Sequence, residues 1–293
     1  MSNTLTRAMT TCGNARVLFL NGKDMVNDAI RFHNLTPTAA AALGRTLIAS
    51  SMIGIMLKNK TDSVTVSFNG DGVCGKILGV ADYYGNVKGF VQHPEADLPQ
   101  NALGKLDVAG AVGKGTLFII RDEGEKEPYV GSVPIVSGEI AEDITSYFAT
   151  SEQIPTVCAL GVLIGTDHTC IAAGGFMIQL LPNADDEFID RLEARLPLIP
   201  PVSTLFSAPK DNAELMKEVL GDIEFDIFDE NEVDYSCDCS RERVEKALIS
   251  ISKADLKEMI DDGESITVEC QFCDKKYTFT PAELRGLLPK NRH

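Results

Sequence analysis

Short runs of alternating apolar and polar residues dominate the first 181 residues of the chain. Ser63–Phe68 alternates strictly, as a strand with one buried face does. Six further runs are typical of strands: Gly75–Ala81, Val87–Gln92, Gly115–Arg121, Tyr129–Pro134, Val157–Ile164 and Thr169–Leu181. Turn sequences such as Asn69-Gly70-Asp71-Gly72 join several of them, which favours antiparallel hairpins. We therefore expect residues 1–181 to form an α+β domain of antiparallel sheets and helices.

Two helices are expected within this domain. Thr36-Pro37 supplies a cap and a first-position proline ahead of an alanine-rich run. The segment Ala39–Leu57 is apolar enough to raise the question of a membrane span, but it contains Arg45 and several hydroxyl side chains that are unfavourable in lipid. A buried helix is the better prediction. Gly138–Ser151 predicts the second helix, with its apolar residues on one face.

Residues 182–235 have a different composition. Fifteen acidic and four basic side chains between positions 183 and 235 give this stretch −11 of the chain's net charge of −16. Glu187–Leu196 and Asn212–Leu220 have amphipathic helical spacing, and helices this short need docking to be stable. The segment is therefore either an ordinary acidic linker with two surface helices or a metastable helical linker that stays folded only while its neighbours hold it.

Residues 236–293 predict a small α+β domain. Ser240 and Ser252 can each cap a helix, the second ending before Gly263. Ile266–Cys270 and Tyr277–Phe279 predict a hairpin, and the Thr280-Pro281 pair opens a final helix. So few residues bury little apolar surface, which makes a stabilising metal ion physically reasonable.

Two close cysteine pairs lie in this last domain, Cys237-Asp238-Cys239 and Cys270-Gln271-Phe272-Cys273. Four thiolates suit a tetrahedral zinc site, Zn²⁺, that is closed to water and most often structural. The spacing equally suits two disulfides. Five cations flank the pairs and would stabilise a negatively charged zinc–thiolate cluster. They are Arg241, Arg243, Lys246, Lys275 and Lys276.

The other bulk features narrow the class of protein. The N-terminus lacks the pattern of a secretory signal peptide, so we expect a cytoplasmic protein, in which eight cysteines do not form a static disulfide framework. The four remaining cysteines are isolated in the sequence, and the contexts of Cys158 and Cys170 predict small core residues. The four are Cys12, Cys74, Cys158 and Cys170. A net charge of −16 argues against a nucleic-acid partner.

The cysteine cluster also allows a redox response. Thiolates are the oxidisable form of cysteine, and losing a bound metal removes binding energy that is also folding energy. If the acidic segment depends on the cysteine domain, oxidation would release both by local unfolding.

The spacing and its flanking residues resemble the heat shock protein 33 family of redox-regulated chaperones. The resemblance includes Cys239–Arg243 (CSRER) and Cys270–Phe279 (CQFCDKKYTF), and it extends to Tyr147–Thr156 (YFATSEQIPT) and Ala172–Met177 (AAGGFM). It spans nearly the whole chain and is weakest in the acidic middle.

The resemblance implies a non-enzymatic, ATP-independent holdase that acts in the stress response. It implies one zinc per chain in an inactive reduced form, then disulfides Cys237–Cys239 and Cys270–Cys273 on oxidation, zinc release, linker unfolding and a homodimer that binds unfolded client proteins. The apolar linker side chains are candidates for client contact: Phe188, Ile189, Leu192, Leu215 and Val219. The alternative is a thiol–disulfide oxidoreductase using Cys270 and Cys273, which would need a thioredoxin-like βαβ setting. A zinc ribbon for nucleic acid is disfavoured by the charge.

Overall fold

The strands of the chain pair into antiparallel sheets, as the alternating pattern predicts. The structure, a computed structural model, describes residues 3–124 and 127–287. The chain divides into two compact units, residues 1–236 and 237–293. The residues treated above as an acidic linker, 182–235, belong to the first unit.

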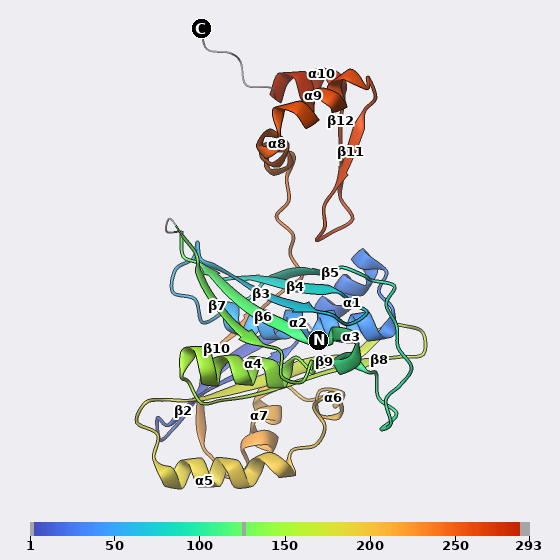
Figure 1. The fold of residues 1–293 in the computed structure, drawn as a ribbon. Coiled ribbons are helices and arrows are strands. Elements are labelled where there is room, and N and C mark those ends of the chain that lie inside the picture. The colour runs from blue at the N-terminus through green and yellow to red at the C-terminus, as the bar shows by residue number, and fades with distance from the viewer. Residues whose placement is uncertain (1–2, 125–126, 288–293) are drawn as a thin grey trace. The chain divides into compact units, whose positions relative to one another are not determined.

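Two five-stranded sheets form the first unit, each antiparallel throughout (Figure 1). One sheet has the order β5 (Val87–Val91), β4 (Lys76–Asp82), β3 (Ser63–Gly70), β6 (Gly115–Asp122), β7 (Tyr129–Pro134). The other has the order β10 (Phe225–Glu232), β1 (Thr4–Thr10), β2 (Ala15–Asn21), β9 (Cys170–Leu180), β8 (Thr156–Ile164). The expected α+β class is confirmed.

The helices of the first unit fall on both sides of the second sheet. They are α1 (Lys23–His33), α2 (Pro37–Gly54), α3 (Val108–Val112), α4 (Ala141–Tyr147), α5 (Asp186–Arg195), α6 (Val202–Leu205) and α7 (Asn212–Leu220). A π-helical turn, η1 (Phe148–Glu152), continues α4, and a 3₁₀ turn, η2 (Leu196–Leu198), follows α5. Figure 1 shows α2 between the two sheets and α5–α7 beyond the second sheet.

The alanine-rich helix α2 is the centre of the main core. Every residue in it except Pro37 and Arg45 is buried. Two of its polar side chains show how such groups are accommodated: Ser50 Oγ donates to the Thr46 carbonyl within the helix at 2.7 Å, and Arg45 pairs with Glu139 at 2.6 Å. The predicted buried helix is confirmed, and no helix among the described residues is long and apolar enough to cross a membrane.

Strand β2 separates two hydrophobic clusters. Leu18 and Leu20 join the main core with α2, whereas Val17 and Phe19 pack on the other face against the acidic segment. A strand buried on both faces reads as a continuous apolar run and not as an alternation, which is why the pattern did not predict β2.

The acidic segment covers the outer face of the second sheet. Leu215 and Val219 of α7 and Phe188 and Leu192 of α5 lie in the same cluster as Phe19, each at most 5% exposed. Both helices begin at an aspartate cap, since the Asp185 side chain accepts from the Phe188 N–H and the Asp211 side chain from the Glu214 N–H. The two predicted amphipathic helices are therefore present.

One buried amide ties α7 to the sheet. Asn212 Nδ2 donates to the Thr4 carbonyl and to Thr6 Oγ1, each at 2.9 Å, and lies 3.4 Å from the Phe19 carbonyl. Because the amide is only 4% exposed, water does not replace these bonds.

The acidic segment ends in strand β10, which the sequence pattern did not predict. It pairs with β1 from Thr4↔Glu232 to Thr10↔Phe225. Arg7 Nε donates to Asp229 at 2.9 Å, and this bond lowers the pKa of Asp229. Tyr235 then anchors the end of the unit, with its hydroxyl donating to the Gly89 carbonyl at 2.7 Å.

The second unit contains α8 (Arg241–Ser250), α9 (Lys253–Asp261), the hairpin β11 (Ile266–Glu269) and β12 (Lys276–Phe279), and α10 (Pro281–Leu287). All three predicted caps are present: Ser240 accepts from Arg243 N–H, Ser252 from Asp255 N–H, and Thr280 from Glu283 N–H. Among residues 237–287, the buried apolar cluster is Leu248, Leu256, Ile260, Phe279 and Leu284.

Replacing Asn212 with alanine should loosen the acidic segment. The change leaves buried carbonyls without a donor, so we expect the free energy of unfolding of the first unit to fall by about 1–3 kcal/mol. Urea denaturation and limited proteolysis of α7 measure the effect. The exposed Asn183→Ala is the matched control and should change neither. Equal stability of the two variants would mean that the Asn212 bonds do not hold α7.

Candidate metal centre

Four cysteines from two separate segments meet in the second unit. Cys237 and Cys239 lie in the extended segment before α8, and Cys270 and Cys273 lie in the turn between β11 and β12. Their sulfur atoms all lie within 4.8 Å of one another. The Cys237 and Cys270 Sγ atoms are 3.6 Å apart, and those of Cys239 and Cys273 are 3.5 Å apart.

These separations fit one zinc ion. Zinc–thiolate bonds of about 2.3 Å in a tetrahedron put neighbouring sulfurs about 3.8 Å apart. The donor set is all sulfur, which suits a soft or borderline metal and leaves no coordination position for water. The four cysteines can therefore hold a metal ion in a closed site.

A helix cap and a hairpin hydrogen bond position the two cysteine pairs. Ser240, the residue directly after Cys239, is the cap that fixes where α8 begins. On the other side, the β11–β12 register ends at Glu269↔Lys276, and the Cys270 N–H donates to the Lys275 carbonyl at 3.0 Å. This bond closes the turn so that both of its thiols face the same point.

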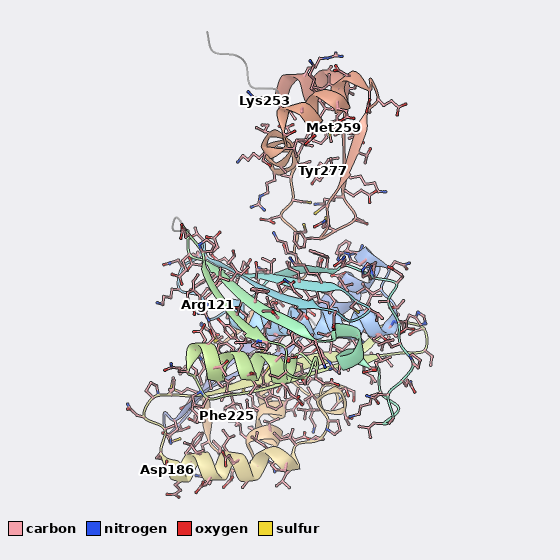
Figure 2. All side chains as sticks on the ribbon, in the orientation of Figure 1. Arg121, Asp186, Phe225, Lys253, Met259 and Tyr277 are labelled. Atoms are coloured by element: carbon pink, nitrogen blue, oxygen red, sulfur yellow. The ribbon has the colours of Figure 1, made fainter. Side chains whose placement is uncertain are left out.

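A tyrosine outside the cysteine motifs contacts the cluster. Tyr277, labelled on β12 in Figure 2, donates its hydroxyl to Cys239 Sγ at 3.1 Å. Burial acts to raise the pKa of Cys239, but hydrogen bonds from Tyr277 and from neighbouring thiols outweigh it and lower that pKa. The same bond raises the pKa of Tyr277 to about 12. Sequence reasoning missed this residue, although its position four residues after Cys273 on a short strand was visible.

The other thiols of the cluster are harder to ionise without a metal. Burial is the main cause that raises the pKa of Cys273 to about 11, and it holds the pKa of Cys237 far above its usual range. A metal that needs thiolates must therefore displace protons on binding, so its affinity rises with pH until those groups have ionised.

Three of the five cations near the cysteines have carboxylate partners. Arg243 pairs with Asp238, Lys276 pairs with Glu269, and Arg241 pairs with Glu283. Arg241 also donates to the Thr278 carbonyl at 2.9 Å and stacks 4.2 Å from the Phe279 ring centroid. These cations fasten the segments that carry the cysteines, and their charge is shared with acids.

The remaining cysteines are set apart from this cluster. Cys74 and Cys170 are buried, Cys158 is partly buried and Cys12 is exposed. Burial raises the pKa of Cys74 to about 11 and the pKa values of Cys158 and Cys170 to about 12. These three thiols, Cys74, Cys158 and Cys170, are therefore protonated and unreactive at neutral pH.

The setting of the Cys270–Cys273 pair is an antiparallel hairpin turn. A redox-active CxxC of the thioredoxin type sits at a helix N-terminus, where the helix lowers the thiol pKa. Cys270 and Cys273 therefore do not lie in the βαβ setting that the oxidoreductase alternative requires.

Replacing Tyr277 with phenylalanine should weaken metal binding. The change keeps the ring and removes the donor to Cys239, and partners in the outer shell of a metal site typically contribute 10–100-fold in affinity. We expect an approximately tenfold loss of Zn²⁺ affinity at pH 7, measured by competition with a chromophoric chelator. Tyr84→Phe, at an exposed tyrosine of the first unit, should leave the affinity unchanged. Equal affinities in the two variants would count against a supporting role for the hydroxyl.

Comparisons with known proteins agree on one family. A family model described as "Hsp33 protein" matches residues 3–280. The chain is 45% identical to a 33 kDa chaperonin of Clostridium acetobutylicum, over 99% of this chain and 98% of the relative, and 45% identical to one of Agathobacter rectalis, over 98% and 100%. A crystal structure of the 33 kDa chaperonin (heat shock protein 33 homolog) of Thermotoga maritima has a TM-score of 0.91 and 33% identity, covering 98% of each chain. The chain belongs to the Hsp33 family, as its sequence motifs predict.

Proposed function

We propose that this protein is a redox-regulated, ATP-independent holdase chaperone that works in the cytoplasm and is not an enzyme. The observation that carries the proposal is the cluster of four thiols within 4.8 Å, whose first cysteine lies two residues after a segment that covers an apolar sheet face. A unit whose folding depends on a metal thus follows directly, along the chain, a segment that can leave the sheet face on which it packs.

The reduced state is the inactive one. Cys237, Cys239, Cys270 and Cys273 hold one Zn²⁺ as thiolates, and the ion stabilises a unit whose apolar core is small. Binding energy of a structural zinc is folding energy in such a unit, so the metal and the fold are lost together.

Oxidation removes the ligands. Each pair of thiolates gives up two electrons and forms one disulfide, Cys237–Cys239 or Cys270–Cys273, while one hydrogen peroxide accepts the electrons and leaves as water and hydroxide. Two peroxides convert all four ligands, and Zn²⁺ leaves because a disulfide sulfur is a poor ligand.

The acidic segment then leaves the sheet. Its surplus of eleven negative charges disfavours the compact state through self-repulsion, and none of the side chains of the described strand β10 is buried. Against this, α5 and α7 bury Phe188, Leu192, Leu215 and Val219, so heat assists the release. Ile189, the residue after Phe188 on α5, is partly buried.

Release creates the client-binding surface. The apolar faces of α5 and α7 become available together with the sheet residues that they covered, such as Phe19 and Phe176. Exposed apolar surface of this kind binds partly unfolded proteins and favours a homodimer of the active form. The acidic surface disfavours nucleic acid as a partner.

Oxidant and mild heating should activate the protein. We expect peroxide to release about one zinc per chain, because four thiolates make one tetrahedral site, and to suppress aggregation of a denatured client protein. A chromophoric zinc chelator and light scattering follow both events in one sample, with dithiothreitol reversal as the control. Zinc release without protection would contradict the chaperone function, and catalytic turnover of a disulfide substrate would favour the oxidoreductase instead.

Cys237→Ser should open the acidic segment without oxidant. Losing one ligand destabilises the zinc-bound unit, so we expect trypsin to cleave between residues 182 and 235 faster than in the wild type under reducing conditions. Cys12→Ser, at an exposed cysteine of the first unit, is the matched control and should resist cleavage. Protease resistance of both variants would show that the segment is independent of the metal.

A further inference from the structure

Strand β10 is held mainly by its backbone. It is the end strand of its sheet, and each of its eight side chains is partly or fully exposed. Phe228 has no partner in β1, because the register shifts by one residue between Arg7 and Ala8, and this side chain is 61% exposed. Little side-chain packing therefore opposes the departure of this strand.

The hydrogen-bonding directions of β1 follow from the bonds at its two ends. The Thr11 N–H donates to the Glu224 carbonyl at 2.9 Å, and the Val233 N–H donates to the Asn3 carbonyl at 3.1 Å. Since backbone groups alternate along a strand, the odd-numbered residues of β1 face β10 and the even-numbered ones face β2. Leu5 and Met9 thus present N–H and carbonyl groups to β10.

Strand β1 does not need β10 for its own position. Leu5, Ala8 and Thr10 are buried, and the strand pairs with β2 from Thr4↔Asn21 to Met9↔Arg16. Losing β10 would therefore leave an ordered strand with an open row of backbone donors and acceptors, which is a template for another extended chain.

We propose that this vacated edge of β1 is a client-binding site, where an extended segment of an unfolded polypeptide adds to the sheet in the place of β10. The inference rests on the proposed function, because β10 must leave first. Strand addition takes its affinity from main-chain bonds and tolerates many sequences, which suits unfolded clients.

The strand that now occupies the edge indicates what kind of segment fits. Arg7 binds Asp229 through Nε at 2.9 Å, and Thr6 Oγ1 donates to Glu230 at 3.1 Å. A client segment with a carboxylate opposite Arg7 is therefore favoured over one with a cation there. Outside this position the side chains of the added strand face largely into solvent, as those of β10 do.

Residue-resolved hydrogen exchange on the full-length protein tests the site. In the reduced state the amides of Leu5 and Met9 should be protected by β10; they should exchange rapidly after oxidation and regain protection when a denatured client is bound. The amides of Thr6 and Ala8, which face β2, are the internal control and should stay protected throughout. Protection of Leu5 and Met9 that persists after oxidation would refute the release of β10 and with it the proposed function.

The other outcomes separate the site from the function. A client that is held while Leu5 and Met9 keep exchanging rapidly would overturn the edge proposal and leave the chaperone function intact. The amides of Leu5 and Met9 could instead be protected in the oxidised protein before client is added, to a degree that grows with protein concentration. That result would show that a second copy of the chain occupies the edge, and it would also overturn the edge proposal.

A synthetic peptide of residues 224–233 provides the matched variants. The Val233 N–H points toward β1, so alternation directs the Asn231 N–H the same way and the Glu230 N–H outward. We expect the fluorescently labelled peptide to bind the oxidised protein and to compete with client. N-methylation at Asn231 should weaken binding about tenfold or more, whereas N-methylation at Glu230 should not. Equal effects of the two methyl groups would exclude strand addition.

Discussion

The second unit depends on four sulfur atoms held within 4.8 Å of one another. Its apolar cluster is small, and the segments that meet there are fastened otherwise by caps, a short hairpin and exposed ion pairs such as Arg243–Asp238. Exposed pairs contribute little, so a metal held by the four thiolates would supply a large share of the folding energy. We propose that the chemistry of the thiolates sets whether the unit is folded.

The first unit, in contrast, is stabilised mainly by its apolar core. Its main core around α2 is extensive and includes only Val233 and Tyr235 from the acidic segment, whose helices pack on the far face of the second sheet. Residues 182–232 can thus leave without dismantling the core. The Tyr235 hydroxyl, bonded to Gly89 and 3.0 Å from His33 Nε2, marks where this removable layer ends, two residues before the first cysteine. We propose that the protein uses this arrangement to expose apolar surface only under oxidative stress.

The sequence is most informative where structure is local. The caps at Ser240, Ser252 and Thr280 were predictable because a capping side chain and its N–H partner are three residues apart. Strand β10 was not, because its acidic residues have low strand propensity and its pairing with β1 spans more than two hundred residues. The cysteine cluster was predictable from its spacing. The Tyr277 bond to Cys239 depends on the exact hairpin register, and the carboxylate partners of the flanking cations depend on how the segments fold back.

The central claim is that the metal, and not oxidation as such, holds the acidic segment in place. Removing zinc with a chelator while dithiothreitol keeps every thiol reduced isolates that variable, and hydrogen exchange of α7, β10 and α2 reports the result. We expect the amides of α7 and β10 to lose protection when zinc is removed, while those of α2 keep it. Unchanged protection of α7 and β10 in the zinc-free, reduced protein would contradict this claim.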